Sequence, residues 1–169
     1  YCYEKPIAKT HANPYSCTPA LKNKHDRVIE AVTSNGGMIG FSLYPHHLKG
    51  KSNCTLESFC QMIADSANKF GVDKIGIGSD LCQDQPDSVV EWMRVGRWSK
   101  EVDYGEGSAD LPGFPQQPSW FQDSRDFVNI ENGLSAVGMH SEEIDKIMGM
   151  NWYNFYSMNF TPSADSVNA

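Results

Sequence analysis

The stretch KIGIGSD, residues 74–80, is a short apolar run of β type that ends in small residues and then in a carboxylate. Glycines in such a run let the backbone approach a neighbour or a ligand closely. An aspartate at the carboxyl end of a parallel strand lies where α/β folds place their chemistry. The stretch therefore predicts a strand over 74–78, with Asp80 as a candidate functional residue.

Two earlier segments have the same layout. PIAKT at 6–10 leads into His11, and GMIGFSL at 37–43 leads into Tyr44. Helices are predicted between the strands, over 26–34 with Asp26 as N-cap and over 56–70 with Thr55 as N-cap. Strand, helix, strand, helix, strand with short links indicates a parallel sheet of an α/β protein. Three such units form either part of an eight-unit barrel or part of a doubly wound sheet.

The remainder of the chain is less regular. Residues 81–123 contain four of the nine prolines and predict an irregular excursion with a short helix near 88–95. Two helices are predicted after it, over 126–137 and over 141–148, the second with Ser141 as N-cap. The polar residues 161–169 predict a disordered tail. Residues 1–160 are predicted to belong to a single domain.

Composition limits the possible functions. The chain has 169 residues, 40% of them apolar, which is enough for one sizeable core. A net charge of −7 argues against nucleic acid as the main partner, and no apolar run is long enough to span a membrane. The five cysteines have irregular spacing, which favours free thiols and a cytoplasmic location. Because the chain lacks an initiator methionine, we expect it to be a fragment or a processed piece.

Several polar residues are candidates for chemistry. A neutral imidazole at His11 suits a divalent metal ion, although a hydrogen-bonded histidine at a strand end is the alternative. Asp80 suits metal binding, orientation of a water molecule or pairing with a substrate ammonium, with a loop carboxylate as the alternative. Lys22 and Lys24 suit a substrate carboxylate, or are simply solvated. Tyr44 offers a hydroxyl to a ligand, or is a half-buried aromatic.

Other polar and aromatic residues favour structural roles. His46 and His47 are adjacent and cannot both face one site, which predicts a surface or loop role for them. Large aromatics dominate core burial, so the four tryptophans are expected to pack in or over the core. They are Trp92, Trp98, Trp120 and Trp152.

Taken together, these motifs resemble a known family. The segments THANPYS at 10–16, Lys22-Asn23, GFSLY at 40–44 and GIGSD at 76–80 are similar to the C-terminal half of the membrane dipeptidase (renal dipeptidase) family. The segment 143–155, with its Gly-x-Asn and following aromatic, is similar to that family's closing helices. These enzymes are binuclear zinc peptidases, family M19 of the amidohydrolase superfamily. No single motif is highly specific, but their order and spacing together carry the resemblance.

The resemblance implies a (β/α)8 TIM-type barrel of which this chain supplies the last three strands and the closing helices. His11 matches the family's final metal-binding histidine, and Asp80 matches the aspartate that holds the substrate's amino group or assists proton transfer. Lys22 falls where the family usually has an arginine that grips the substrate carboxylate, and lysine lacks the bidentate fork of arginine. Tyr44 matches a tyrosine of the substrate pocket.

The implied function is hydrolysis of free dipeptides by a water that two zinc ions activate. The family's other metal ligands and its catalytic histidine have no counterpart here, and we expect them upstream of Tyr1. The expected partners are a dipeptide substrate, the missing N-terminal half of the barrel and, in a homodimer, a second copy. No hydrophobic tail for a lipid anchor is present. Two alternatives are a related amidohydrolase that acts on another small amide or modified amino acid, and a non-catalytic barrel relative.

Overall fold

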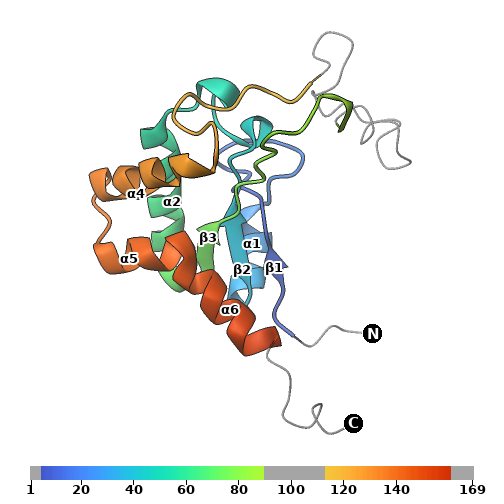
Figure 1. Cartoon of the computed structure of the whole chain (residues 1–169). Coiled ribbons are helices and arrows are strands. Elements are labelled where there is room, and N and C mark those ends of the chain that lie inside the picture. Colours follow the sequence, from blue (N-terminus) through green and yellow to red (C-terminus); the bar gives the residue numbers. More distant parts are fainter. Residues whose placement is uncertain (1–4, 90–112, 161–169) are drawn as a thin grey trace, which may run out of the picture.

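Three parallel strands form one small sheet in the computed structural model, which describes residues 5–89 and 113–160. The strands are β1 (Ala8–Lys9), β2 (Met38–Phe41) and β3 (Ile75–Ile77), in that spatial order. Helix α1 (Asp26–Ser34) links β1 to β2, and helix α2 (Leu56–Phe70) precedes β3. The predicted βαβαβ order is confirmed, with strands shorter than predicted. The loops that follow the strands gather at one end of the sheet (Figure 1).

One face of the sheet carries the apolar core. Ile39 of β2 pairs with Ile75 of β3, and both are fully buried. They pack in one cluster with Ile29 of α1 and with Phe59 and Ile63 of α2. Burial of each such side chain contributes about 1.5–3 kcal/mol. The helical spacing of Phe59 and Ile63 thus points α2 at the sheet, as the sequence predicted.

A tryptophan covers part of the opposite face. Gly40 and Gly76 are paired positions of β2 and β3, and Trp152 lies against both. A Cβ atom added to Gly76 would lie 2.5 Å from Nε1 of this indole, and one added to Gly40 would lie 2.9 Å from Cζ2. The indole Nε1 donates a hydrogen bond of 2.9 Å to the carbonyl of Ile77. At Gly76 glycine therefore makes room for a side chain of the protein itself, and at Gly40 it makes room both for the indole and for the still closer carbonyl of Thr10.

The capping predictions hold for α2 and are wrong by one residue for α1. Thr55 Oγ1 accepts a hydrogen bond of 3.1 Å from the Ser58 amide, and Gly71, with φ +92°, ends the helix. The N-cap of α1 is His25, so that Asp26 is the first helical residue. The Asp26 carboxylate instead accepts hydrogen bonds from Ser16 Oγ (2.9 Å) and Lys69 Nζ (2.6 Å), because Lys69 of α2 lies beside it. That ion pair lowers the pKa of Asp26.

The C-terminal part contains one helix more than predicted. Helix α4 (Phe127–Ala136) and helix α5 (Ser141–Asp145) match the two predicted helices, although the N-cap of α5 is His140 and not Ser141. A π-helical turn over Lys146–Met150 then leads into α6 (Asn151–Phe160), which Figure 1 shows running past the lower ends of the strands. Asn151 Nδ2 donates to the carbonyls of Val72 and Ile75, which fixes the start of α6 below β3.

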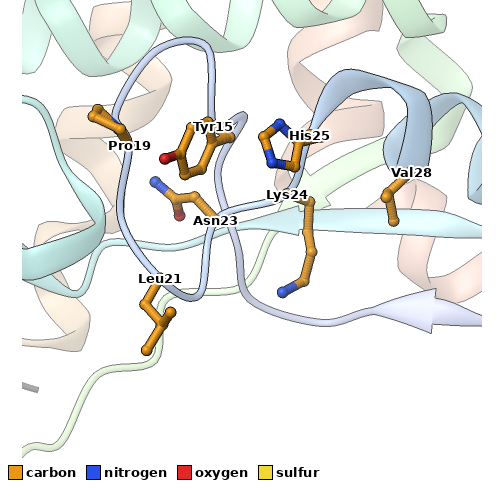
Figure 2. Close-up of a pocket in the computed structure, with 7 residues that line it drawn as sticks. All are labelled: Tyr15, Pro19, Leu21, Asn23, Lys24, His25 and Val28. Atoms are coloured by element: carbon orange, nitrogen blue, oxygen red, sulfur yellow. The ribbon is translucent and has the colours of Figure 1, made fainter. Parts of the chain in front are cut away.

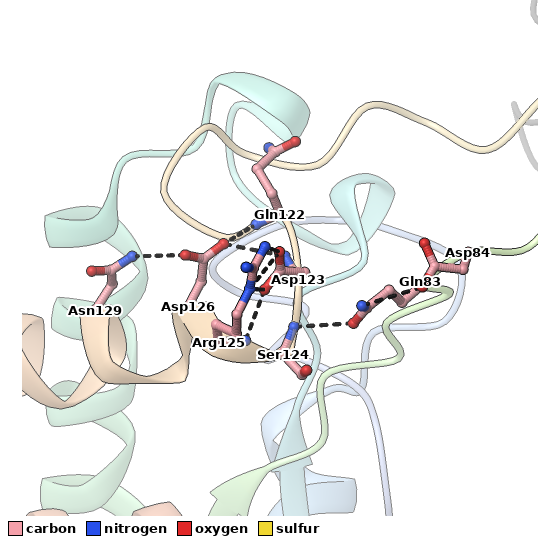
Figure 3. A network of polar contacts seen from close by, with 8 residues as sticks. All are labelled: Gln83, Asp84, Gln122, Asp123, Ser124, Arg125, Asp126 and Asn129. Atoms are coloured by element: carbon pink, nitrogen blue, oxygen red, sulfur yellow. Dashed lines mark hydrogen bonds and ion pairs between the residues drawn. The ribbon is translucent and has the colours of Figure 1, made fainter.

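A polar network ties the loop after β3 to the start of α4 (Figure 3). The Ser124 amide donates a hydrogen bond of 3.1 Å to Gln83 Oε1. Asp126 accepts hydrogen bonds from the amides of Gln122 and Asp123, and Arg125 pairs with Asp123. This pairing lowers the pKa of Asp123 to about 2. The segment that follows Asp80 is therefore fastened to the helical part of the chain.

Several predictions concern residues that the structure does not describe. Most of the predicted helix 88–95, Trp92, Trp98 and the tail 161–169 lie outside the described residues. Among the described residues, Trp120 packs at the core as predicted, with its ring centroid 5.5 Å from that of Phe59. Cys17, Cys54, Cys60 and Cys82 are free thiols. None of the helices that the structure describes has the length and apolar character needed to cross a bilayer.

Candidate functional site

The four site residues predicted from the sequence lie in the loops at the carboxyl ends of the strands. His11 follows β1, Tyr44 follows β2 and Asp80 follows β3, while Lys22 lies in the long loop between β1 and α1. His11 and Tyr44 are half-buried, and Lys22 and Asp80 are exposed. This is the end of a parallel sheet at which α/β proteins bind their ligands.

His11 is held by its neighbours in the chain. Thr10 Oγ1 lies 2.9 Å from Nδ1 of the His11 ring, and the amide of Ala12 donates a hydrogen bond of 2.9 Å to the carbonyl of Gly40. When Nδ1 of a histidine donates to an oxygen, Nε2 keeps a lone pair that suits a metal ion. In the tautomer in which Nδ1–H donates to Thr10, His11 fits the role of a metal ligand through Nε2.

A buried hydrogen-bond network joins the loops after β1 and β2. Asn13 and Asn23 are almost completely buried, and the amide of Asn13 donates to Asn23 Oδ1 (3.0 Å). Asn13 Nδ2 donates to the carbonyls of Ser42 and His47, and Asn13 Oδ1 accepts from the Ser42 amide. Asn23 Nδ2 also donates to the His47 carbonyl, at 3.0 Å. The network satisfies buried backbone groups, each of which would otherwise cost about 1–3 kcal/mol.

The network fixes the neighbours of two predicted site residues. Asn13 is two residues after His11, and Asn23 is next to Lys22. Lys24, on the other side of Asn23, is held through its backbone: its amide donates to the Asn13 carbonyl (2.9 Å), and its carbonyl accepts from the Tyr15 amide (2.8 Å). The loop that carries His11 and Lys22 is thereby anchored to the end of β2.

His47 lies in the connection between β2 and α2, as the predicted loop role allows, but it is buried, so a surface role is wrong for this residue. Its side chain is 5% exposed, and Nδ1 lies 2.8 Å from Ser42 Oγ, which also accepts from the Tyr44 amide. The ring centroids of Tyr44 and His47 are 5.2 Å apart. Burial, followed by the positive charges of Lys22 and His11, lowers the pKa of His47 to about 4. His47 is therefore neutral at pH 7, and its ring lies beside that of Tyr44, one of the predicted site residues.

The pKa of Lys9 is affected by several charged residues of these loops. It lies at the end of β1 and is half-buried. Burial lowers its pKa, the charges of Lys24 and Lys22 lower it further, and the charge of Asp80 raises it. Lys24, Lys22 and Asp80 thus each act electrostatically on Lys9.

Asp80 has an unusual backbone conformation. Its φ of +57° lies in the left-handed region, which costs a residue with a side chain about 1–2 kcal/mol. The strand ends are paired up to the residue before it, because the Leu43 amide donates a hydrogen bond of 3.1 Å to the Ser79 carbonyl. Backbone conformations of this kind concentrate at functional sites, which agrees with Asp80 as a candidate functional residue.

A cavity of about 530 Å³ lies beside the loop that carries Lys22 and Lys24 (Figure 2). Its lining residues come from this loop and from the start of α1; they are Tyr15, Pro19, Leu21, Asn23, Lys24, His25 and Val28. The Tyr15 and His25 rings lie with centroids 4.3 Å apart. Figure 2 shows the Lys24 side chain extending away from these two rings, toward the strands.

The described residues do not assemble a complete metal centre. No three histidine, cysteine, aspartate or glutamate side chains within 5–89 and 113–160 come together in a geometry that would hold a metal ion. His11 fits as a single imidazole ligand, as its bond to Thr10 allows. The other ligands that a metal centre needs are not among these residues.

Sequence reasoning missed the buried residues of the site. Asn13, Asn23 and Ser42 carry no spacing signal, because their partners are backbone groups of distant segments. Lys9 offered one signal, since a lysine inside an otherwise apolar strand segment is unusual. His47 offered none beyond its neighbour His46.

The fold is that of an α/β protein with a parallel sheet, and the predicted site residues lie at the carboxyl ends of its strands. The family model described as membrane dipeptidase, peptidase family M19, matches residues 2–97. The chain belongs to this family. The resemblance expected from the sequence is thus confirmed.

Individual relatives agree with this assignment. The dipeptidase tcpJ of Claviceps purpurea is 23% identical over 147 residues, which cover 86% of this chain and 28% of that protein. An amidohydrolase from Pseudomonas aeruginosa has a similar structure, with a TM-score of 0.78, 24% identity, and coverage of 90% of this chain and 45% of that one. A metallo peptidase from Rhodobacter sphaeroides, bound to a phosphinate mimic of the dipeptide L-Ala-D-Ala, gives a TM-score of 0.68 and 18% identity, over 92% of this chain and 37% of that one. The chain therefore spans less than half the length of these relatives.

Proposed function

We propose that the protein is a zinc-dependent dipeptidase that hydrolyses the peptide bond of free dipeptides. The observation that carries this proposal is that His11, Lys22 and Asp80 all lie in loops at the carboxyl ends of parallel strands, in a chain of the dipeptidase family. A metal ligand, a cation and a carboxylate in one region are the groups that dipeptide recognition and hydrolysis require.

We also propose that the three strands belong to a (β/α)8 barrel. The parallel order β1-β2-β3, with α1 and α2 on one face, is the arrangement that successive units of such a barrel have. β1 forms the edge of the described sheet, and a further strand beside it would continue the curve of a barrel. The relatives, which are about twice as long as this chain or longer, have the length that such a barrel needs.

The residues of this chain would have separate roles in binding the substrate and the metal. Lys22 pairs with the C-terminal carboxylate of the dipeptide, and Asp80 pairs with its N-terminal ammonium. His11 contributes an imidazole to the metal site, with Thr10 fixing the ring. A bound divalent metal supplies a water of lowered pKa and polarises the scissile carbonyl. Two opposite charges at a fixed separation would select dipeptides over longer peptides.

The test compares free, N-acetylated and C-amidated dipeptides in an active form of the protein. Asp80→Asn keeps a residue type that tolerates the left-handed backbone, and should lower kcat/KM for free dipeptides at least about tenfold while affecting N-acetylated ones less. Lys22→Ala should weaken discrimination between a free carboxylate and its amide. Asp84→Asn is the matched control, because Asp84 is exposed, lies in the same loop and also has a positive φ, of 56°.

Two results would contradict this proposal. If all three substrates lose the same factor in Asp80→Asn, Asp80 does not bind the substrate's amino group. The polypeptide of residues 1–169 alone is expected to be inactive, but if the full-length protein that contains it, loaded with zinc, hydrolyses no dipeptide, the chain belongs to a protein with another substrate or without catalysis.

A further inference from the structure

The side chain assigned to the substrate carboxylate is not itself held by the protein. Lys22 is exposed, and within residues 5–89 and 113–160 its amine has no hydrogen bond or ion pair. A lysine amine stands on a flexible stem, so the positions that it can reach depend on where the backbone lies. The residues that fix the backbone of Lys22 therefore decide where a carboxylate can bind.

Lys22 occupies the third position of a β-turn. The backbone amide of Asn23 donates a hydrogen bond of 3.0 Å to the carbonyl of Ala20, which closes a turn over residues 20–23. This bond fixes the shape of the turn, but it does not fix where the turn lies relative to the strands. A second set of contacts, made by the side chain of Asn23, does so.

The Asn23 side chain ties the turn to the ends of two strands. It is 5% exposed, and Nδ2 donates to the carbonyls of Thr18 (2.9 Å) and His47 (3.0 Å), while Oδ1 accepts from the Asn13 amide (3.0 Å). Asn13 lies in the segment after β1, and His47 lies after β2. All three partners are backbone groups, and the site requires two donors and one acceptor, which the amide of asparagine supplies.

The segment that follows His11 does not depend on Asn23 for its position. The side chain of Asn13 makes its own bonds to the end of β2, because Nδ2 donates to the carbonyls of Ser42 and His47 and Oδ1 accepts from the Ser42 amide. These bonds remain when the Asn23 side chain is removed. A change at Asn23 should therefore displace Lys22 while the segment after His11 stays in place.

We propose that Asn23 is a positioning residue that sets the preference for dipeptides with a free C-terminal carboxylate. It does so by holding the turn that carries Lys22 at a fixed place beside the strand ends. The inference rests on the proposed function, which assigns Lys22 to that carboxylate. A small displacement of a group that positions the substrate is enough to lower the rate by one or more orders of magnitude.

The test measures the ratio of kcat/KM for a free dipeptide to that for its C-terminal amide, in the zinc-loaded full-length protein that contains this chain. Asn23→Ala should lower this ratio at least about tenfold, through a higher KM for the free dipeptide. The loss falls on KM because the carboxylate is bound equally in the ground state and in the transition state. Asn23→Ser keeps a hydroxyl and should lower the ratio less, and it provides the same comparison if Asn23→Ala does not fold.

Asn151→Ala is the matched control for a general loss of stability. Asn151 is also 5% exposed, and its Nδ2 also donates to two backbone carbonyls, those of Val72 (2.7 Å) and Ile75 (2.8 Å), but at the amino end of β3. Its removal should destabilise the protein in urea and leave the ratio unchanged. A ratio that falls as far in Asn151→Ala as in Asn23→Ala, or equal losses for both substrates in Asn23→Ala, would overturn the inference.

Lys22→Ala separates this inference from the proposed function. If Lys22→Ala lowers the ratio and both Asn23 variants leave it unchanged, Lys22 binds the carboxylate and only the role of Asn23 is wrong. If Lys22→Ala leaves the ratio unchanged, the proposed role of Lys22 is wrong and the inference is overturned with it. A ratio lowered by Lys22→Ala and by Asn23→Ala, and intermediate in Asn23→Ser, supports the inference.

Discussion

Lowering the pH from 7 to 5 should destabilise the protein through His47. Burial holds the pKa of this imidazole at about 4, against 6.5 for the same group in an unfolded chain. Above pH 6.5 both states are neutral at His47 and the stabilisation is complete. As the pH falls below 6.5, His47 becomes protonated in the unfolded state but stays neutral in the folded state. The free energy of unfolding therefore decreases, and it continues to decrease until the pH reaches the folded-state pKa of about 4. The full difference corresponds to about 3 kcal/mol, of which about 2 kcal/mol is lost by pH 5.

Urea denaturation of the protein at pH 7 and pH 5 measures this loss. His47→Gln should remove most of the pH dependence in this range, because glutamine does not titrate. His46→Gln is the matched control, since His46 is the adjacent histidine and is half-buried rather than buried. The depressed carboxylate pKa values of Asp26 and Asp123 act at lower pH and do not contribute to this window. A pH dependence that survives His47→Gln unchanged, or that disappears in His46→Gln, would refute the reasoning.

Two further predictions concern the sheet and the metal. Gly76→Ala places a methyl group 2.5 Å from Nε1 of Trp152 and should lower the free energy of unfolding by about 1–3 kcal/mol. Gly149→Ala, with no heavy atom within 4 Å of its added Cβ, is the control and should lower it less. Equal losses in urea denaturation would show that the indole can move aside. The polypeptide of residues 1–169 should bind zinc weakly and through His11, since a tight site needs several ligands from different segments. Calorimetric titration with zinc measures this binding. Two tightly bound equivalents, or binding unaffected by His11→Ala, would contradict the prediction.

The helices and strands were largely predictable because each has a local signal. Thr55 and Gly71 bracket α2, and the spacing of Phe59 and Ile63 sets its buried face. The N-cap of α1 was misplaced by one residue because Asp26 has a stronger local preference for that position than His25, while its actual partner, Lys69, is distant in sequence. Helix α6 was missed because its apolar side chains have no clear helical period, and Tyr153, Met158 and Phe160 are exposed.

The site was predictable only in part. His11, Lys22, Tyr44 and Asp80 were found because each follows or flanks a strand end, or matches a family position. The buried residues that hold them were not found, since a network such as that of Asn13 joins backbone groups that lie about thirty residues apart in the sequence. Such long-range partners leave no trace in periodicity or spacing.

Around the strand ends, exposure and anchoring are divided between different residues. The groups assigned to the substrate, Lys22 and Asp80, are exposed, whereas the amides of Asn13 and Asn23 are buried. Both amides donate to one acceptor, the His47 carbonyl, so that a displacement at His47 moves the segments that carry His11 and Lys22 together. The neutral imidazole of the same residue lies 2.8 Å from Ser42 Oγ, and the backbone of Ser42 in turn bonds to the Asn13 side chain. Charging the imidazole in acid should disturb substrate recognition at a pH where the strands and helices are still intact, because loops open locally before a core unfolds.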